Sequence, residues 1–174
     1  MTMRTAGFNT VDISAMGPVT LVLMLGLMFV GGSSGSTAGG VKTSTIAVVF
    51  LSVRAMLTGR SEIEVGERTI EQTTVYKAIS IVVIFSALFF LGFIALLLTD
   101  PELGFQSLMF EAMSALATVG LSQGVTPSLS TEGRLVVLFL MFVGRIGPLT
   151  LALAISERQH AARIHYPTGH IMVG

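Results

Sequence analysis

The chain has 174 residues, 52% of them hydrophobic and only 11% charged, with 10 basic and 10 acidic side chains. Because soluble domains are about 25% charged, this composition is typical of a membrane protein and argues against a cytosolic enzyme. The balanced charge provides no basic surface for nucleic acid, and the lack of cysteine excludes disulfides, thiol catalysis and cysteine-ligated zinc.

The first apolar stretch begins at Pro18 and reaches only Val30, where a run of small residues over positions 31–40 interrupts it. Apolar character resumes over residues 41–57. At about 1.5 Å per residue the first half measures roughly 20 Å, which is short of the ~30 Å hydrocarbon core of a bilayer. We therefore expect the two halves to form one broken helix. The residues before it contain an acid and only one base, which argues against a signal peptide.

The rest of the chain holds one uninterrupted apolar span and two other candidate helices. Residues 75–98 have spanning length, and from Ala78 onward they carry no charged side chain. Residues 104–117 are moderately apolar and of helix length, which favours a re-entrant half-helix. Residues 133–155 are of spanning length, but two glycines, Arg145 and Pro148 interrupt their middle.

Basic residues indicate the orientation of these segments. They bracket the loop over residues 58–74 and follow the last span, whereas the turn after residue 98 carries only acids. By the positive-inside rule, the loop and the C-terminal tail over residues 156–174 are cytoplasmic, and residues 118–134 face the outside. The basic residues concerned are Arg54, Arg60, Arg68, Lys77, Arg158 and Arg163.

An internal repeat appears when the chain is compared with itself at an offset of 113 residues. Residues 27–31, Leu-Met-Phe-Val-Gly, are identical to residues 140–144, and residues 5–9 align with residues 118–122 around a shared Thr-x-Gly. Each complete unit is then an outer helix, a half-helix, a Thr-x-Gly turn and an inner helix that breaks midway. The second unit is complete, and we expect the outer helix and half-helix of the first to lie upstream of Met1.

This succession of elements is the layout of a cation pore. Carbonyl oxygens must replace the hydration shell of the ion, and Gly7 and Gly120 permit the backbone angles that aim successive carbonyls inward. A half-helix that points its C-terminus at the cavity places the negative end of its dipole near the cation. Glu111, two turns before Thr118, either holds the turn through backbone amides or faces the outer vestibule.

The glycine-rich run over residues 31–43 invites a nucleotide-binding interpretation. That interpretation fails because Val41 separates Gly40 from Lys42, whereas a phosphate loop needs glycine and lysine to be contiguous. Apolar half-helices on both sides also argue against a solvent-exposed linker. We expect a mobile intramembrane loop that lies in the permeation path below the Thr-x-Gly turns.

Arg145 is a cation near the middle of an apolar span. Such a charge costs about 2.5 to 3.5 kcal/mol on insertion scales, so its side chain should face a cavity or bind carbonyls. The repeat aligns Arg145 with Gly32 at the start of the glycine run, and we expect it to hydrogen-bond carbonyls of that loop. It then sets a positive barrier that takes part in gating, or it locks the fold, and the two roles can coexist.

Enzymatic chemistry finds no support in the polar residues. His160, His165 and His170 are spaced by five, not at the i, i+4 spacing that places two metal ligands on one helical face. No grouping of serine, histidine and an acid suggests a triad. The sequence predicts that the chain is not an enzyme and binds no cofactor.

Several of these segments together resemble the TrkH/KtrB superfamily of bacterial potassium uptake proteins, which includes the plant HKT transporters. The similar segments are residues 4–8, the glycine run over 31–45, Glu111 with Ser114 and Ala115, residues 118–122, and Gly-Arg-Ile-Gly-Pro-Leu-Thr over 144–150. The resemblance covers nearly the whole chain. The glycine run and the segment around Arg145 are its most specific parts.

The resemblance implies four helix, pore-helix, helix units in one subunit around a potassium pathway, each giving one filter turn with a central glycine. It also implies homodimers and a cytoplasmic nucleotide-binding regulatory subunit of the TrkA/KtrA type. The implied filter residues, which bind K⁺ through carbonyls, are Thr5, Ala6, Gly7, Phe8, Thr118, Val119, Gly120 and Leu121, with Glu111 as support. The implied gating residues are Gly31, Gly32, Gly35, Gly39, Gly40, Lys42 and Arg145.

The expected fold is an all-α integral membrane protein with about one and a half of four units. Residues 1–57 end the third unit, residues 58–74 form a cytoplasmic loop, residues 75–155 form the fourth unit, and 156–174 are the tail. The expected function is potassium uptake across a bacterial plasma membrane as the multi-pass conducting subunit, with Na⁺ as a second candidate ion. The alternative is a non-conducting membrane remnant or accessory subunit that assembles with other chains.

Overall fold

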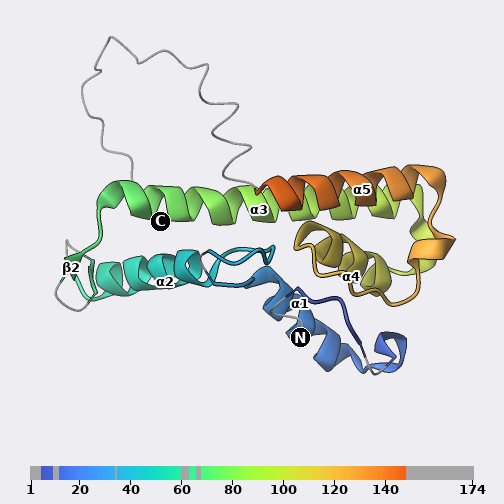
Figure 1. Cartoon of the computed structure of the whole chain (residues 1–174), viewed down its shortest axis with the longest axis horizontal. Helices are drawn as coiled ribbons and strands as arrows, with labels where there is room; N and C mark the ends of the chain where they lie inside the picture. Colours follow the sequence, from blue (N-terminus) through green and yellow to red (C-terminus); the bar gives the residue numbers. More distant parts are fainter. Residues whose placement is uncertain (1–4, 10–11, 34, 60–62, 66–67, 148–174) are drawn as a thin grey trace, which may run out of the picture.

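The computed structural model describes residues 5–9, 12–33, 35–59, 63–65 and 68–147 (Figure 1). The tail over residues 156–174 and residues 148–155 of the expected inner helix lie outside the described residues. The described part is helical, as expected from the sequence, with one short hairpin added.

The expected broken helix is present as two helices with an irregular segment between them. α1 (Pro18–Phe29) starts with proline at its first position, where the missing amide costs no hydrogen bond. α2 (Thr43–Leu57) begins after the glycine run and carries Arg54 in its last turn, where a positive charge complements the helix dipole. Both helices are too short to cross a bilayer alone.

The loop over residues 58–74 contains a hairpin that sequence patterning did not predict. β1 (Glu64–Val65) pairs antiparallel with β2 (Arg68–Thr69), so that Glu64 lies opposite Thr69. The amide of Ile70 extends the ladder by donating to the carbonyl of Ile63 at 2.8 Å. Two-residue strands have no alternation of apolar side chains, which is why the pattern of residues gave no signal.

α3 (Gln72–Thr99) extends past both ends of the span expected over residues 75–98. Its 28 residues measure about 42 Å, more than the ~30 Å hydrocarbon core. Among the described residues, it is the one helix that is both long and apolar enough to span a membrane. A 3₁₀ turn, η3 (Pro101–Leu103), follows it.

α4 (Phe105–Leu116) lies where the half-helix is expected, and every residue from Phe110 to Leu116 is buried. A helix that is buried on all sides has neighbours on all sides. α3, α5 and α1 contact it. α5 (Thr131–Ile146) follows, and Gly147, with a φ of 90°, ends it by donating its amide to the carbonyl of Val143.

The long helix α3 organises the arrangement (Figure 1). α2 runs antiparallel beside the N-terminal half of α3, and α5 runs antiparallel beside its C-terminal half. Close packing of α3 on α5 depends on Gly92, because a Cβ there would lie 2.6 Å from the side chain of Leu140. α4 packs against α3 and α5, and α1 packs against α4.

Large apolar side chains cover the outside of this helical assembly. Phe90, Leu91 and Leu98 on α3 are 58%, 66% and 79% exposed, and Phe139 and Phe142 on α5 are similarly exposed. Many large exposed apolar side chains are characteristic of faces that contact lipid or further protein. The exterior therefore agrees with the composition in placing the chain in a membrane.

The 113-residue repeat is visible in the order of the elements. The 3₁₀ turn η2 (Ile13–Ala15) and the start of α1 at Pro18 have counterparts 113 residues later, in η4 (Thr126–Ser128) and the start of α5 at Thr131. The bounds of these elements differ only at the end of the helix. α1 stops at Phe29, whereas α5 continues four residues beyond the equivalent Phe142.

Candidate functional site

The two Thr-x-Gly turns have the same unusual backbone. Thr5 and Thr118 have φ of 49° and 52°, and they are the non-glycine residues with positive φ in the described part of the chain. Gly7 and Gly120 have φ of 66° and 81°, so left-handed residues alternate with an ordinary one in each turn. A left-handed threonine costs roughly 1 to 2 kcal/mol, and strain of this kind is concentrated at functional sites.

The turns lie against each other, backbone to backbone. A Cβ added to Gly7 would lie 3.1 Å from the carbonyl oxygen of Val119 and 3.6 Å from that of Gly120. A Cβ added to Gly120 would lie 3.5 Å from the Cα of Gly7. A side chain at either position would therefore enter the space between the turns, where the carbonyl oxygens of the second turn lie.

The second turn is anchored to α4. The amide of Thr118 donates to the carbonyl of Ala115 at 3.0 Å, and the amide of Val119 donates to that of Ser114 at 2.9 Å. The side chains of Val119 and Leu121 are buried in the core. These bonds hold the C-terminus of α4, with the negative end of its dipole, directly beside the turn.

Glu111 supports the end of the second turn through hydroxyl groups. Its side chain is buried, and its Oε1 accepts a hydrogen bond from the hydroxyl of Thr126. Thr126 also pairs with the hydroxyl of Ser122 at 3.0 Å, and that hydroxyl accepts the amide of Gly124. From the sequence we expected Glu111 to bond to backbone amides or to face an open vestibule, and the observed contact is instead to the side chain of Thr126.

The segment between α1 and α2 is a closed loop, here called the glycine loop (residues 31–42). Its neck is a parallel bridge between Val30 and Val41. The amide of Val41 donates to the carbonyl of Phe29 at 2.9 Å, and the amide of Gly31 donates to the carbonyl of Val41 at 2.8 Å. A Cβ at Gly31 would overlap the carbonyl of Gly39, which explains the small residue at this crossing.

The glycine loop lies directly on the second turn. A Cβ at Gly39 would overlap both the carbonyl oxygen of Ala117 and the hydroxyl of Thr118. Gly40 has a φ of 74° and its Cβ position faces the backbone of Gly31 and the carbonyl of Met28. By contrast, Gly35 has positive φ with open space around it. At Gly39, where the loop meets the second turn, there is thus no room for a side chain.

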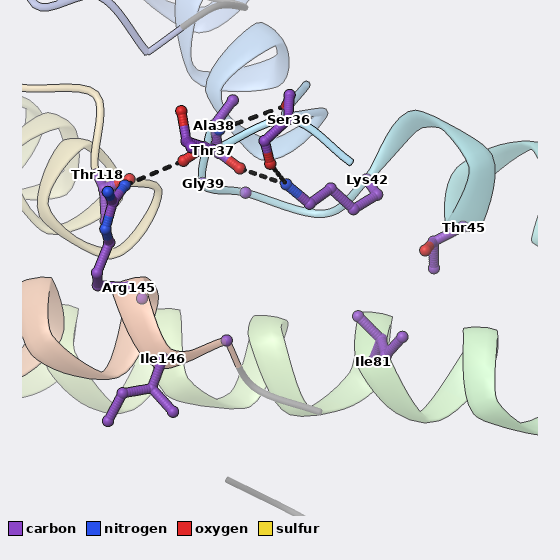
Figure 2. Close-up of a pocket in the computed structure, with 13 residues that line it drawn as sticks. Ser36, Thr37, Ala38, Gly39, Lys42, Thr45, Ile81, Thr118, Arg145 and Ile146 are labelled. Carbon is purple, nitrogen blue, oxygen red and sulfur yellow. Dashed lines mark hydrogen bonds between the residues drawn. The ribbon is translucent and has the colours of Figure 1, made fainter. Parts of the chain in front are cut away.

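Two cations hold the tip of the glycine loop from different directions (Figure 2). Arg145 of α5 donates from its Nη1 to the carbonyl of Thr37 at 3.0 Å, and Lys42 donates from its Nζ to the carbonyls of Ser36 at 2.9 Å and Ala38 at 2.6 Å. The expected contact between Arg145 and a loop carbonyl is confirmed. Its participation in gating stays a prediction.

A cavity of about 380 Å³ lies around these contacts. The glycine loop, Thr45 of α2, Ile81 of α3, Thr118 and the end of α5 line it. A second cavity of about 260 Å³ lies beside the second turn, between α4 and α5, and Glu111 is one of its lining residues. Thr118 of the second turn, Lys42 and Arg145 therefore line one cavity.

Asp100 joins two helices through hydrogen bonds that the residue pattern did not predict. Its carboxylate accepts the amide of Ser130 at 2.7 Å and the hydroxyl of Ser130 at 3.0 Å, and it also accepts the hydroxyl of Thr99. Ser130 in turn caps α5 by accepting the amide of Gly133. These bonds join the end of α3 to the start of α5.

The pKa of Asp100 reflects these contacts. Burial acts to raise it, but the hydrogen bonds from Ser130 and Thr99 and the nearby charge of Arg134 together lower the pKa below its usual value. The Ser-Thr-Glu sequence at residue 130 is typical of a helix start. Nothing in the residue pattern, however, indicated that Ser130 pairs with a carboxylate thirty residues earlier.

The chain is similar to known proteins in sequence and in fold. The chain matches the model of the TrkH family, described as cation transport protein, over residues 1–164. It is 40% identical over 174 residues to "Ktr system potassium uptake protein B" of Bacillus subtilis and 39% identical over 171 residues to the protein of that name in Vibrio alginolyticus. It is 37% identical over 179 residues to "Potassium/sodium uptake protein NtpJ" of Enterococcus hirae.

The matches cover nearly all of this chain and a smaller part of each relative. They include 100%, 98% and 100% of this chain but only 39%, 37% and 40% of the three relatives. The fold is similar to the crystal structure of the potassium transporter TrkH from Vibrio parahaemolyticus, with a TM-score of 0.69 and 24% identity. That similarity covers 88% of this chain and 35% of the solved chain.

Proposed function

Because the chain belongs to the TrkH family of cation transport proteins, we propose that it forms part of a potassium-conducting membrane subunit. The observation that carries this proposal is the pair of Thr-x-Gly turns, which share their alternating φ signs and meet through carbonyls and glycines. Relatives named as potassium uptake proteins rather than as enzymes support it.

The proposed conduction step is exchange of water for carbonyl oxygens. A K⁺ ion that enters between the turns loses part of its hydration shell and gains carbonyl oxygens such as those of Val119 and Gly120. The C-terminus of α4 adds a favourable negative potential. Thr118, at the start of the turn, lines the cavity below it, so an ion that leaves the turn enters the cavity beside the glycine loop.

The glycine loop is the proposed gate. Gly39 lies against Thr118, and the tip of the loop is bonded to Arg145. Movement of the loop away from Thr118 requires loss or exchange of the Arg145 bond, so this arginine acts as the latch and adds a positive barrier to cation exit. The role of Arg145 as a fold-locking residue is compatible with this step.

The same proposal covers the location, the oligomeric state and the regulatory partner of the subunit. The assembly is a multi-pass protein of a bacterial plasma membrane with a cytoplasmic C-terminus, and a homodimer in its full-length form. A nucleotide-binding subunit of the TrkA/KtrA type regulates it, and Na⁺ is a second candidate ion because one relative is named a potassium/sodium uptake protein. Four filter turns complete the pathway, of which this chain contributes Thr5–Phe8 and Thr118–Leu121.

The test uses a chimaera in which residues 1–174 replace the matching 39% of the Bacillus subtilis relative. We expect this chimaera to restore growth of an uptake-deficient bacterial strain at low potassium, and Gly120→Asp to abolish the rescue. Gly124→Asp is the matched control, because Gly124 also has positive φ, 84°, but has nothing within 4 Å of its Cβ position. Normal rescue by Gly120→Asp contradicts the filter assignment, and a chimaera that inserts without any uptake favours a non-conducting accessory role.

A further inference from the structure

The two cations at the tip of the glycine loop are bonded in different ways. Arg145 reaches the loop from α5 and contacts one carbonyl, that of Thr37. Lys42 belongs to the neck of the loop itself and contacts two carbonyls, those of Ser36 and Ala38. In Figure 2 the two side chains approach the tip from opposite sides.

The carbonyls of Ser36 and Ala38 converge on one point. Both oxygens lie within hydrogen-bond distance of the same Nζ atom, at 2.9 and 2.6 Å, while the carbonyl of Thr37 between them is bonded to Arg145. A primary ammonium group and a potassium ion are similar in size and charge, and both are stabilised by carbonyl oxygens at these distances. The position of the ammonium is therefore one that a dehydrated monovalent cation can occupy.

This position is next to the path of the ion. Ser36, Ala38 and Lys42 line the same cavity as Thr118, and Thr45 lines it on the side of α2. An ion that leaves the second turn enters a space that already holds two fixed positive charges. Repulsion between like charges opposes the entry of the ion, so the ion is bound stably there only if one fixed charge leaves its carbonyls.

We propose that the carbonyls of Ser36 and Ala38 form a monovalent-cation site below the filter, and that Lys42 occupies it as a tethered competitor. This inference rests on the proposed function, because it uses the ion path defined there. Displacement of the ammonium by a permeating ion frees the tip of the loop on one side and leaves it held by Arg145 alone. Ion exit and loop release are then parts of one exchange.

The first test measures binding without transport. The purified chimaera is titrated with Tl⁺, a potassium surrogate, by equilibrium dialysis, and we expect Lys42→Met to bind one Tl⁺ per subunit more than wild type. Lys77→Met is the matched control, since Lys77 is the other lysine of the chain. Equal stoichiometry in Lys42→Met and wild type overturns the proposal, and this result is independent of whether the protein conducts.

The second test replaces the tethered ammonium with a free one. In proteoliposomes, we expect Lys42→Ala to raise Tl⁺ flux in the resting state several-fold, and propylammonium to lower that flux again. Tetramethylammonium, which has no N–H donor, should have no effect. Flux that is raised but insensitive to propylammonium indicates a loosened loop and overturns the cation-site assignment. If Lys42→Ala does not reach the membrane, Lys42→Met carries the same test, because it keeps the length of the side chain.

Discussion

The two Thr-x-Gly turns have similar backbone angles but differ in the burial of their side chains. Both have positive φ at the threonine and at the glycine. In the second turn Leu121 is 6% exposed, whereas the equivalent Phe8 in the first turn is 76% exposed. The described residues thus contain the helix that supports the second turn, α4, and no counterpart for the first.

This difference indicates that the backbone angles and the side-chain burial of each turn depend on different parts of the protein. The positive φ at the threonine and at the glycine is present in both turns, although only the second turn has a supporting helix, so the local sequence and the facing turn are enough to set these angles. The side chains need a separate helix for burial. In the chimaera, we expect this exposed face of the first turn to be covered by residues of the Bacillus subtilis relative, of which the present chain matches 39%.

Gly31 and Gly144 are equivalent positions of the repeat, but each lies against a different partner, and substitution here should have the largest effect. A Cβ at Gly144 would overlap the carbonyl of Leu116, and a Cβ at Gly31 would overlap that of Gly39. Because backbone atoms cannot move aside cheaply, we expect Gly144→Ala to destabilise the chimaera by about 3 kcal/mol or more. Heating followed by size-exclusion chromatography measures this. Gly26→Ala is the control, since Gly26 has nothing within 4 Å of its Cβ position.

Truncation to alanine should have different effects at Leu121, which is buried, and at Phe8, which is exposed. Truncation of a buried leucine costs about 2 to 5 kcal/mol, whereas an exposed side chain usually costs less than about 0.5 kcal/mol. In the chain of 174 residues in detergent, Leu121→Ala should lower the unfolding temperature strongly and Phe8→Ala should leave it unchanged. In the chimaera, we expect both changes to be destabilising. A Phe8→Ala chimaera as stable as its parent contradicts the proposed cover over the first turn.

The helices that follow the two turns differ in their N-terminal caps, and this difference should make stability depend on pH. Ser130 and Asp100 cap α5, whereas Gly17 begins α1 without a side-chain bond. Because the pKa of Asp100 is lowered in the folded protein, its carboxylate adds stability above the pKa of an unfolded aspartate, about 3.9. That stability is lost as pH falls through the lower folded value. When the pH falls from about 5 to about 3, we expect the unfolding temperature of Asp100→Asn to fall less than that of its parent, because the variant has no carboxylate here to protonate.

The smallest expected effects come from the cap residues themselves. Ser130→Ala removes a cap and should cost about 1 kcal/mol, whereas Gly17→Ser adds one to α1 and should gain only a few tenths of a kcal/mol. Gly17 has an ordinary φ of −67° and open space at its Cβ position, so the new serine fits. A loss of stability in Gly17→Ser, measured by the same heating assay, would indicate that a further segment already covers this helix start.

The sequence predicted the helices well because apolar runs of distinct length are direct signals. The run over residues 75–98, the half-helix over 104–117 and the break after Val30 all have counterparts in the structure. The contact between Arg145 and the glycine loop was also predictable, because a charge in an apolar helix needs carbonyls and the repeat aligned it with Gly32. The division into pore units and the gating roles stay predictions.

Other features depended on contacts between distant residues. The pairing of Asp100 with Ser130, and of Glu111 with Thr126, follows from how α3, α4 and α5 pack, and neither leaves a periodic pattern. The positive φ of Thr5 and Thr118 was not predictable, because threonine ordinarily avoids that region. The two bonds of Lys42 depend on the closed shape of its loop.

The spacing between each turn and its helix limits how such a protein can change length. The same number of residues separates Gly7 from Pro18 and Gly120 from Thr131. At 3.6 residues per turn, one inserted residue rotates the following helix by about 100°. Its buried side chains would then face lipid, and Gly144 would lose its place against Leu116. Insertions and deletions should therefore be tolerated in the hairpin region over residues 58–71 and rejected between a Thr-x-Gly turn and its helix, which a scan of single-residue insertions can map directly.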